Sequence, residues 1–291
     1  MKTILITGAA GLLGTTLVPY LKKCGHSIAT HARTGEADFL VDLADRDKSF
    51  AILTQIQPGM IINLASLTSV ELCQDQPNMA YLANTRTVEN IAYWIEKTEA
   101  NCHLIQISTD HVYDGAVMHT EDKITLTNIY AFSKYAGELA AARVPSSILR
   151  TNFIGRSKVS HRESLSDWVY TSLTNGKHVQ VLDDVFFSPL SMNTLVEMIK
   201  LVVEKKPVGI FNLGSHNGMS KADFDFAFAE RLNLPTGTMS RIETRQAAFL
   251  KAYRPKDMRM DCAKFENTLG VKLPQLKDEI IRVAKEYDEV A

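Results

Sequence analysis

The chain has 291 residues, a formal net charge of −1 and 45% hydrophobic residues, which predict a sizeable buried core. The near-neutral charge gives no basic footprint for nucleic acid or an anionic membrane, and no apolar run reaches the roughly 18 residues of a membrane span. Four widely spaced cysteines argue against a disulfide framework or a cysteine zinc site. With no secretory signal pattern at the N-terminus, a reducing cytoplasm is expected.

The first predicted element is a short strand, Ile4–Thr7, which ends in a glycine turn. Gly8, Gly11 and Gly14 follow with the spacing Gly-x-x-Gly-x-x-Gly, and an amphipathic helix is predicted over Leu12–Cys24. The first turn of a helix has unpaired N–H groups and carries the positive end of the helix dipole. We therefore predict that this turn binds a pyrophosphate, as in dinucleotide-binding folds.

The second predicted strand, His26–Thr30, bears on the choice of cofactor. NAD-selective sites usually place an acidic residue near the end of this strand, on the ribose hydroxyls. Here Arg33 follows the strand, and the first acidic residue after the glycine turn is Glu36. Because an arginine can pair with a 2′-phosphate, the sequence favours NADP (NADPH) over NAD. A solvated loop arginine is the alternative, and the use of NAD stays open.

Further strands and helices alternate along the chain. Strands are predicted at Ala37–Val41, Met60–Ala65, His103–Ser108, Ser147–Arg150 and Gly209–Leu213, and helices at Asp45–Gln55, Asn78–Lys97, Asn193–Lys205 and Asp223–Leu232. This alternation predicts an α/β fold with a Rossmann-type, doubly wound parallel sheet. Residues 1–154 plus about 190–214 are expected to form a dinucleotide-binding domain. Residues from about 155–189 plus 215–291 are expected to form a smaller, discontinuous α+β substrate lobe.

Polar side chains follow the strand His103–Ser108, beginning with Thr109. Further on, Tyr130 and Lys134 are four positions apart on a predicted helix, so both lie on one helical face. A neighbouring ammonium lowers the pKa of a phenol from its usual value of about 10. This pattern predicts that Tyr130 is a general acid or base and that Thr109 holds a substrate carbonyl. A core tyrosine beside a surface lysine is the alternative.

These motifs together resemble the extended short-chain dehydrogenase/reductase superfamily and, within it, the dTDP-4-dehydrorhamnose reductase family. The resemblance runs nearly end to end. The residues that carry it are Thr7–Gly14, Asn63–Glu71, Asn84, Ser108–Gly115, Tyr130 with Lys134, Leu149–Asn152 and Tyr253–Asp257.

The resemblance implies a role for each matching position. It implies cofactor contacts from Gly8, Gly11, Leu12, Leu13, Gly14, Asp42, Leu43, Ala65, Ser66, Tyr130 and Lys134. The implied catalytic group is Thr109, Tyr130 and Lys134, and the implied substrate contacts are Thr68, Val70, Asp110, Asn152 and Arg254. No acidic cluster in the sequence predicts a metal site.

The implied reaction is NADPH-dependent reduction of the C4 ketone of a nucleotide-linked deoxysugar, in deoxysugar or polysaccharide precursor biosynthesis. Related 4,6-dehydratases carry Asp-Glu where this chain has Asp110-His111, which disfavours dehydration. Phe153 stands where these reductases usually have tryptophan, so the identity of the sugar stays open. Two alternatives remain: an epimerase of the same superfamily, and a non-catalytic NADP-binding regulatory subunit. A monomer and a homodimer are both compatible with the sequence.

Overall fold

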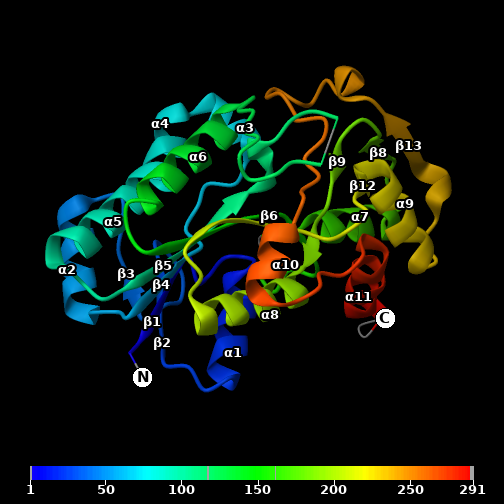
Figure 1. The fold of residues 1–291 in the computed structure, drawn as a ribbon. Coiled ribbons are helices and arrows are strands. Elements are labelled where there is room, and N and C mark those ends of the chain that lie inside the picture. The colour runs from blue at the N-terminus through cyan, green and yellow to red at the C-terminus, as the bar shows by residue number, and fades with distance from the viewer. Residues whose placement is uncertain (1, 117, 161, 289–291) are drawn as a thin grey trace.

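The computed structural model describes residues 2–116, 118–160 and 162–288, and a seven-stranded parallel sheet lies at its centre (Figure 1). The strands are β1 (Ile4–Thr7), β2 (Ile28–Ala32), β3 (Phe39–Leu40), β4 (Met60–Asn63), β5 (His103–Thr109), β6 (Ser146–Thr151) and β11 (Gly209–Leu213). Their spatial order is β11-β6-β5-β4-β1-β2-β3. The predicted doubly wound sheet is confirmed, and the strand Gly209–Leu213 joins it beside β6 as expected.

Helices cover both faces of the sheet (Figure 1). One face carries α1 (Gly14–Lys23), α8 (Met192–Lys205) and α10 (Ala263–Leu269), and the other carries α2 (Arg46–Ile56), α5 (Thr87–Thr98) and α6 (Ile129–Ala141). Side chains alternate between the faces along a strand. Accordingly Ile4 and Ile6 pack with the first set of helices, whereas Leu5 packs with the second. Both faces are buried, as expected for a parallel sheet.

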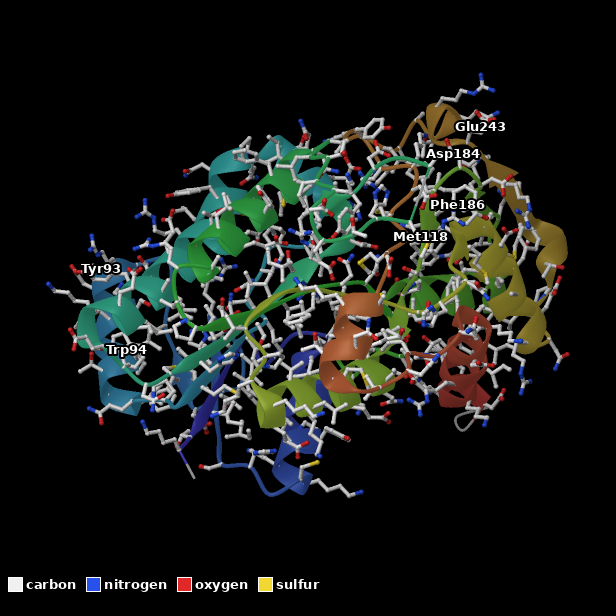
Figure 2. All side chains as sticks on the ribbon, in the orientation of Figure 1. Tyr93, Trp94, Met118, Asp184, Phe186 and Glu243 are labelled. Atoms are coloured by element: carbon white, nitrogen blue, oxygen red, sulfur yellow. The ribbon has the colours of Figure 1, made fainter. Side chains whose placement is uncertain are left out.

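A second hydrophobic cluster, here called the C-terminal cluster, lies at the end of the molecule opposite α2 and α5 (Figure 1). It is built from α7 (Leu165–Thr174), α9 (Lys221–Arg231), α11 (Leu276–Asp288), β8 (Val179–Leu182) and β13 (Met239–Ile242). Figure 2 marks this end by Asp184, Phe186 and Glu243, and the opposite end by Tyr93 and Trp94. The division of the chain into two domains stays a prediction.

Short strand pairs connect the C-terminal cluster with the sheet. They are β7 (Phe153–Ile154) with β10 (Leu190–Ser191), and β9 (Phe186–Phe187) with β12 (Met219–Ser220). The second pair is antiparallel, and β12 leads directly into α9. The segment that follows β6 therefore passes from the carboxyl end of this strand into the C-terminal cluster.

The helix predicted over Asn78–Lys97 is interrupted in the structure. It consists of α4 (Pro77–Tyr81), a π-helical turn at Leu82–Arg86, and α5, and a short α3 (Val70–Asp75) precedes it. The π-turn contains Asn84, whose carbonyl oxygen lies so close to α6 that a Cβ on Gly137 would approach it to 2.4 Å. Turns of this kind are common at functional sites. Within residues 2–116, 118–160 and 162–288, no helix has the length and hydrophobicity of a membrane span.

Candidate functional site

The glycine turn lies where the order of the strands reverses. β1 is flanked by β2 and β4, so Gly8 and Ala65 follow neighbouring strands at the carboxyl edge of the sheet. Gly8 has a φ of 67°, and a Cβ there would lie 2.8 Å from the Ala65 nitrogen. A Cβ on Gly14 would lie 2.3 Å from the Ala9 carbonyl oxygen. A tight glycine turn that leads into the N-terminus of a helix is typical of a diphosphate site in dinucleotide-binding folds.

The residues predicted for the adenosine half of the cofactor follow β2 and β3. Arg33 comes directly after β2 and is exposed, so its guanidinium is accessible to a phosphate group. The Asp42 carboxylate accepts a hydrogen bond from the Ala44 nitrogen at 3.0 Å. Leu43 is buried, and its carbonyl oxygen accepts a hydrogen bond from the Asn90 side chain.

Thr109, Tyr130 and Lys134 are brought together at the carboxyl end of β5, and all three are buried. Thr109 is the last residue of β5, and its hydroxyl lies beside the Tyr130 phenol. Tyr130 is in the first turn of α6, which begins under a side-chain cap from Asn128. The Lys134 ammonium donates a 2.7 Å hydrogen bond to the Ile107 carbonyl oxygen, which ties α6 to β5.

The acid-base properties of this group differ from those expected from the sequence. Burial raises the pKa of Tyr130 above its usual value, and the nearby Asp110 carboxylate raises it further. The Lys134 ammonium is not among the groups that shift the pKa of Tyr130 here, and it donates to the Ile107 carbonyl oxygen. That Lys134 lowers the pKa of Tyr130 stays a prediction. Burial also lowers the pKa of Lys134 to about 8. Tyr130 is therefore protonated at neutral pH, which is the form that a general acid requires.

Asn84 connects the loop after β4 with the helix that carries Tyr130. Its side-chain oxygen accepts hydrogen bonds from the Leu67 nitrogen at 2.7 Å and from the Ser66 hydroxyl at 2.9 Å. Its side-chain nitrogen donates to the Leu67 carbonyl oxygen and to the Ser133 hydroxyl on α6. Both polar atoms of the Asn84 side chain therefore form hydrogen bonds that hold the loop after β4 and helix α6 together. Asn84 was among the residues that carry the family resemblance, but the sequence did not predict that it positions these two elements.

The residues predicted to contact the substrate surround the same edge. The Asn152 side chain, just after β6, donates a 2.8 Å hydrogen bond to the Asp110 carboxylate, and burial raises the pKa of Asp110 to about 6. Val70 begins α3, and the next residue, Glu71, accepts a 2.6 Å hydrogen bond from the Arg254 guanidinium. The Arg254 charge is thus already paired with a carboxylate.

Two further side chains near this group were not predicted to take part. The His111 ring packs edge-on against Tyr130, with ring centroids 5.3 Å apart. Burial lowers the pKa of His111 to about 3, assisted by the charges of Lys221 and Arg254, so this imidazole is neutral. Lys221, the first residue of α9, lies close enough to Asp110 to affect its pKa. No sequence motif marks Lys221, and folding alone brings it to the site.

Among the described residues, no group of three or more His, Cys, Asp or Glu side chains is arranged to hold a metal ion. The polar groups at this edge of the sheet include the Thr109 hydroxyl, the Tyr130 phenol, the Lys134 ammonium and the Asp110 carboxylate.

Comparison with known proteins gives similar chains of about the same length. A "probable low-salt glycan biosynthesis reductase Agl14" of Haloferax volcanii is 26% identical, with 98% of each chain covered. A dTDP-4-dehydrorhamnose reductase of Aggregatibacter actinomycetemcomitans is 27% identical, with 94% of this chain and 95% of that protein covered. Methionine adenosyltransferase 2 subunit beta of Rattus norvegicus is 26% identical, with 93% of this chain and 83% of that protein covered.

The fold is also similar to those of solved structures. The crystal structure of dTDP-4-dehydrorhamnose reductase from Bacillus anthracis in complex with NADP has a TM-score of 0.88 and 22% identity, with 98% of this chain and 99% of that chain covered. The family model described as the RmlD substrate binding domain matches residues 1–289. The resemblance found in the sequence is thereby confirmed, and the chain belongs to the RmlD substrate binding domain family.

Proposed function

We propose that this chain is an NADPH-dependent reductase that reduces the C4 ketone of a nucleotide-linked deoxysugar. The observation that carries the proposal is the set of groups at the carboxyl ends of the sheet strands. A glycine turn suited to a diphosphate and the buried Thr109, Tyr130 and Lys134 meet there. The similar reductases named above, one of which acts in glycan biosynthesis and another on dTDP-4-dehydrorhamnose by name, support this reaction class.

In the proposed mechanism, each residue acts at a defined atom. A nicotinamide cofactor held at the glycine turn would supply the hydride that the C4 carbon of the sugar receives. Tyr130 donates its phenolic proton to the C4 oxygen as negative charge develops there, which general acid catalysis requires. The Thr109 hydroxyl donates a hydrogen bond to the same oxygen and orients the carbonyl. Lys134 supplies a positive charge beneath the site and binds the ribose hydroxyls of the cofactor.

For the cofactor, the proposal is NADP rather than NAD. Arg33, exposed at the end of β2, pairs with the 2′-phosphate, and the diphosphate binds at Gly8, Gly11 and Gly14, where Leu12 and Leu13 contribute their backbone. A ratio of kcat/KM that favours NADPH over NADH supports this choice. A clear preference for NADH contradicts it.

For the substrate, the proposed sugar contacts are Thr68, Val70, Asp110 and Asn152. The last two are already joined by a hydrogen bond, which fixes the direction of the Asp110 carboxylate. Arg254 is assigned to the diphosphate of the nucleotide because it lies in the segment Tyr253–Asp257 that carries the resemblance; in the structure its guanidinium pairs with Glu71. Changing Arg254 to Ala is expected to raise the KM for a nucleotide sugar without changing the affinity for NADPH.

The decisive experiment incubates the protein with NADPH and a panel of nucleotide-linked 4-keto deoxysugars and follows the loss of NADPH absorbance. Oxidation of NADPH with one of these sugars supports the proposal. An epimerase would convert the sugar without consuming added NADPH. A regulatory subunit, which the similarity to a methionine adenosyltransferase subunit keeps as a second candidate, would bind NADPH and oxidise none.

A further inference from the structure

An arginine from the segment that leads to the C-terminal cluster reaches the glycine turn. Arg162 lies between β7 and α7, far from the turn in sequence. Its Nη2 atom donates a 3.0 Å hydrogen bond to the Thr68 hydroxyl, in the loop after β4. Its Nη1 atom lies 3.6 Å from the position that a Cβ would take on Gly11. The guanidinium therefore spans the loops that follow β1 and β4.

No carboxylate of the described residues neutralises the charge of Arg162. No ion pair joins Arg162 to a carboxylate in residues 2–116, 118–160 and 162–288. Other arginines of the C-terminal half differ in this respect, since Arg254 pairs with Glu71 and Arg259 pairs with Asp257. The only hydrogen bond of the Arg162 side chain within those residues goes to a neutral hydroxyl.

The surroundings of Arg162 favour an anion. Gly11 lies in the turn that precedes α1, whose N-terminus carries the positive end of the helix dipole. Arg162 is exposed, and its guanidinium adds a second positive group at the same turn, so a negatively charged ligand bound there would be stabilised by both. A guanidinium matches the oxygens of a phosphate group in geometry as well as in charge.

We propose that Arg162 binds the diphosphate of the dinucleotide cofactor and is a cofactor-binding residue supplied from outside the sheet. This inference rests on the proposed function, because it takes the glycine turn as the diphosphate site. The Thr68 hydroxyl holds the guanidinium over the turn. Since Thr68 is also a proposed sugar contact, one side chain connects the cofactor and substrate sites.

The test compares Arg162→Gln with Arg162→Lys and with a matched control, Arg245→Gln. Arg245 is exposed in the same half of the chain and pairs with Glu243, away from the turn. Calorimetric titration measures the Kd of each protein for NADPH and for adenosine 2′-monophosphate, which lacks the diphosphate. Initial rates measure the KM for the nucleotide sugar, and a thermal melt checks that each variant is folded.

The expected result is a rise of about tenfold to a hundredfold in the NADPH Kd of Arg162→Gln, the size of one charge-assisted phosphate contact. The Kd of Arg162→Gln for adenosine 2′-monophosphate stays at the wild-type value. Arg162→Lys loses less affinity for NADPH than Arg162→Gln, and Arg245→Gln binds NADPH with the wild-type Kd. An unchanged NADPH Kd overturns the inference, as does equal weakening of both ligands. An effect confined to the KM of the nucleotide sugar also overturns it, and assigns Arg162 to the substrate diphosphate.

The experiment distinguishes a failure of cofactor binding from a failure of the role of Arg162. If the wild-type protein binds no NADPH, the proposed function itself fails. If the wild type binds NADPH and Arg162→Gln binds it equally well, the role of Arg162 fails and the proposed function stands.

Discussion

The Lys134 ammonium donates a 2.7 Å hydrogen bond to the carbonyl oxygen of Ile107. Lys134 lies one helical turn after Tyr130 on α6. This bond fixes α6 against β5, the strand that ends at Thr109. The Tyr130 phenol is consequently held at the end of this strand. It is protonated because burial raises its pKa. The positions of the donor group and of its neighbours are set by the packing of one helix on one strand.

Tyr130→Phe is expected to lose most of its turnover while the affinity for NADPH is kept. The phenol is the proposed proton donor, and loss of a general acid typically costs a factor of about 10²–10⁴ in rate. Stopped-flow rates and NADPH titration check this. Tyr135→Phe, which removes a hydroxyl one residue beyond Lys134 on the same helix, is the control and should behave as the wild type. Wild-type turnover in Tyr130→Phe would contradict the assignment.

The affinity for NADPH is expected to fall as the pH rises through about 8. Burial lowers the pKa of Lys134 from 10.5 to about 8, so the ammonium that binds the ribose loses its proton above that value. Fluorescence titration of NADPH from pH 6.5 to 9.5 measures this dependence. In Lys134→Met the dependence should disappear, together with much of the affinity. A wild-type Kd that is constant over this range would contradict the prediction.

Two glycines of the turn should respond differently to the same change. In Gly14→Ala the new methyl group would lie 2.3 Å from the Ala9 carbonyl oxygen, so the backbone must shift and the melting temperature should fall. In Gly11→Ala it would meet the Gly8 carbonyl oxygen at 3.2 Å and project into the turn. Gly11→Ala should therefore keep most of its stability and lose affinity for NADPH.

Thermal melts and calorimetric titration of the two variants provide the comparison. The account expects the stability loss in Gly14→Ala to exceed that in Gly11→Ala. Normal NADPH binding by Gly11→Ala would show that the diphosphate lies elsewhere.

Asp225→Asn is expected to make the stability of the protein less sensitive to a rise in pH between about 4 and 8. Asp225 is buried on α9, one of its oxygens has no hydrogen-bond partner among the described residues, and burial raises its pKa to about 8. Between the unfolded pKa of about 4 and this value, the folded state holds the proton more tightly than the unfolded state. The wild type therefore loses stability as the pH rises through this window, by up to about 1.4 kcal/mol per pH unit.

Urea unfolding at pH 5.5, 7 and 8.5 tests this sign. The gain in unfolding free energy of Asp225→Asn over the wild type should grow with pH. Asp223→Asn is the control, because Asp223 is exposed on the same helix and pairs with Arg241. A gain that shrinks or stays constant with pH would contradict the interpretation.

The sheet was predictable from the sequence because each buried strand is a short apolar run between turn signals. The bounds predicted for Gly209–Leu213 are those of β11. The predicted strand Ala37–Val41 is only Phe39–Leu40 in the structure, since it lies at the sheet edge and pairs with just two residues of β2. Asp38 instead hydrogen-bonds back to Thr30.

The candidate site was predictable where it follows a motif. Tyr130 and Lys134 are found by their spacing on one helix. Three features had no such signal. Helical periodicity cannot detect the π-turn at Asn84, which depends on partners in two other elements. Arg162 lies in a segment without periodicity, and Lys221 reaches Asp110 only through the packing of the C-terminal cluster.

The central claim is hydride transfer from NADPH to the C4 carbon of a nucleotide-linked sugar, with Tyr130 as the proton donor. Its most direct test is incubation of the protein with NADPH deuterated at the reactive nicotinamide carbon and a nucleotide-linked 4-keto deoxysugar, followed by NMR of the sugar. We predict deuterium at C4 of the product with the wild type, and the same transfer slowed by a factor of about 10²–10⁴ with Tyr130→Phe. A converted sugar without deuterium at C4, or deuterium transfer at an undiminished rate in Tyr130→Phe, would contradict it.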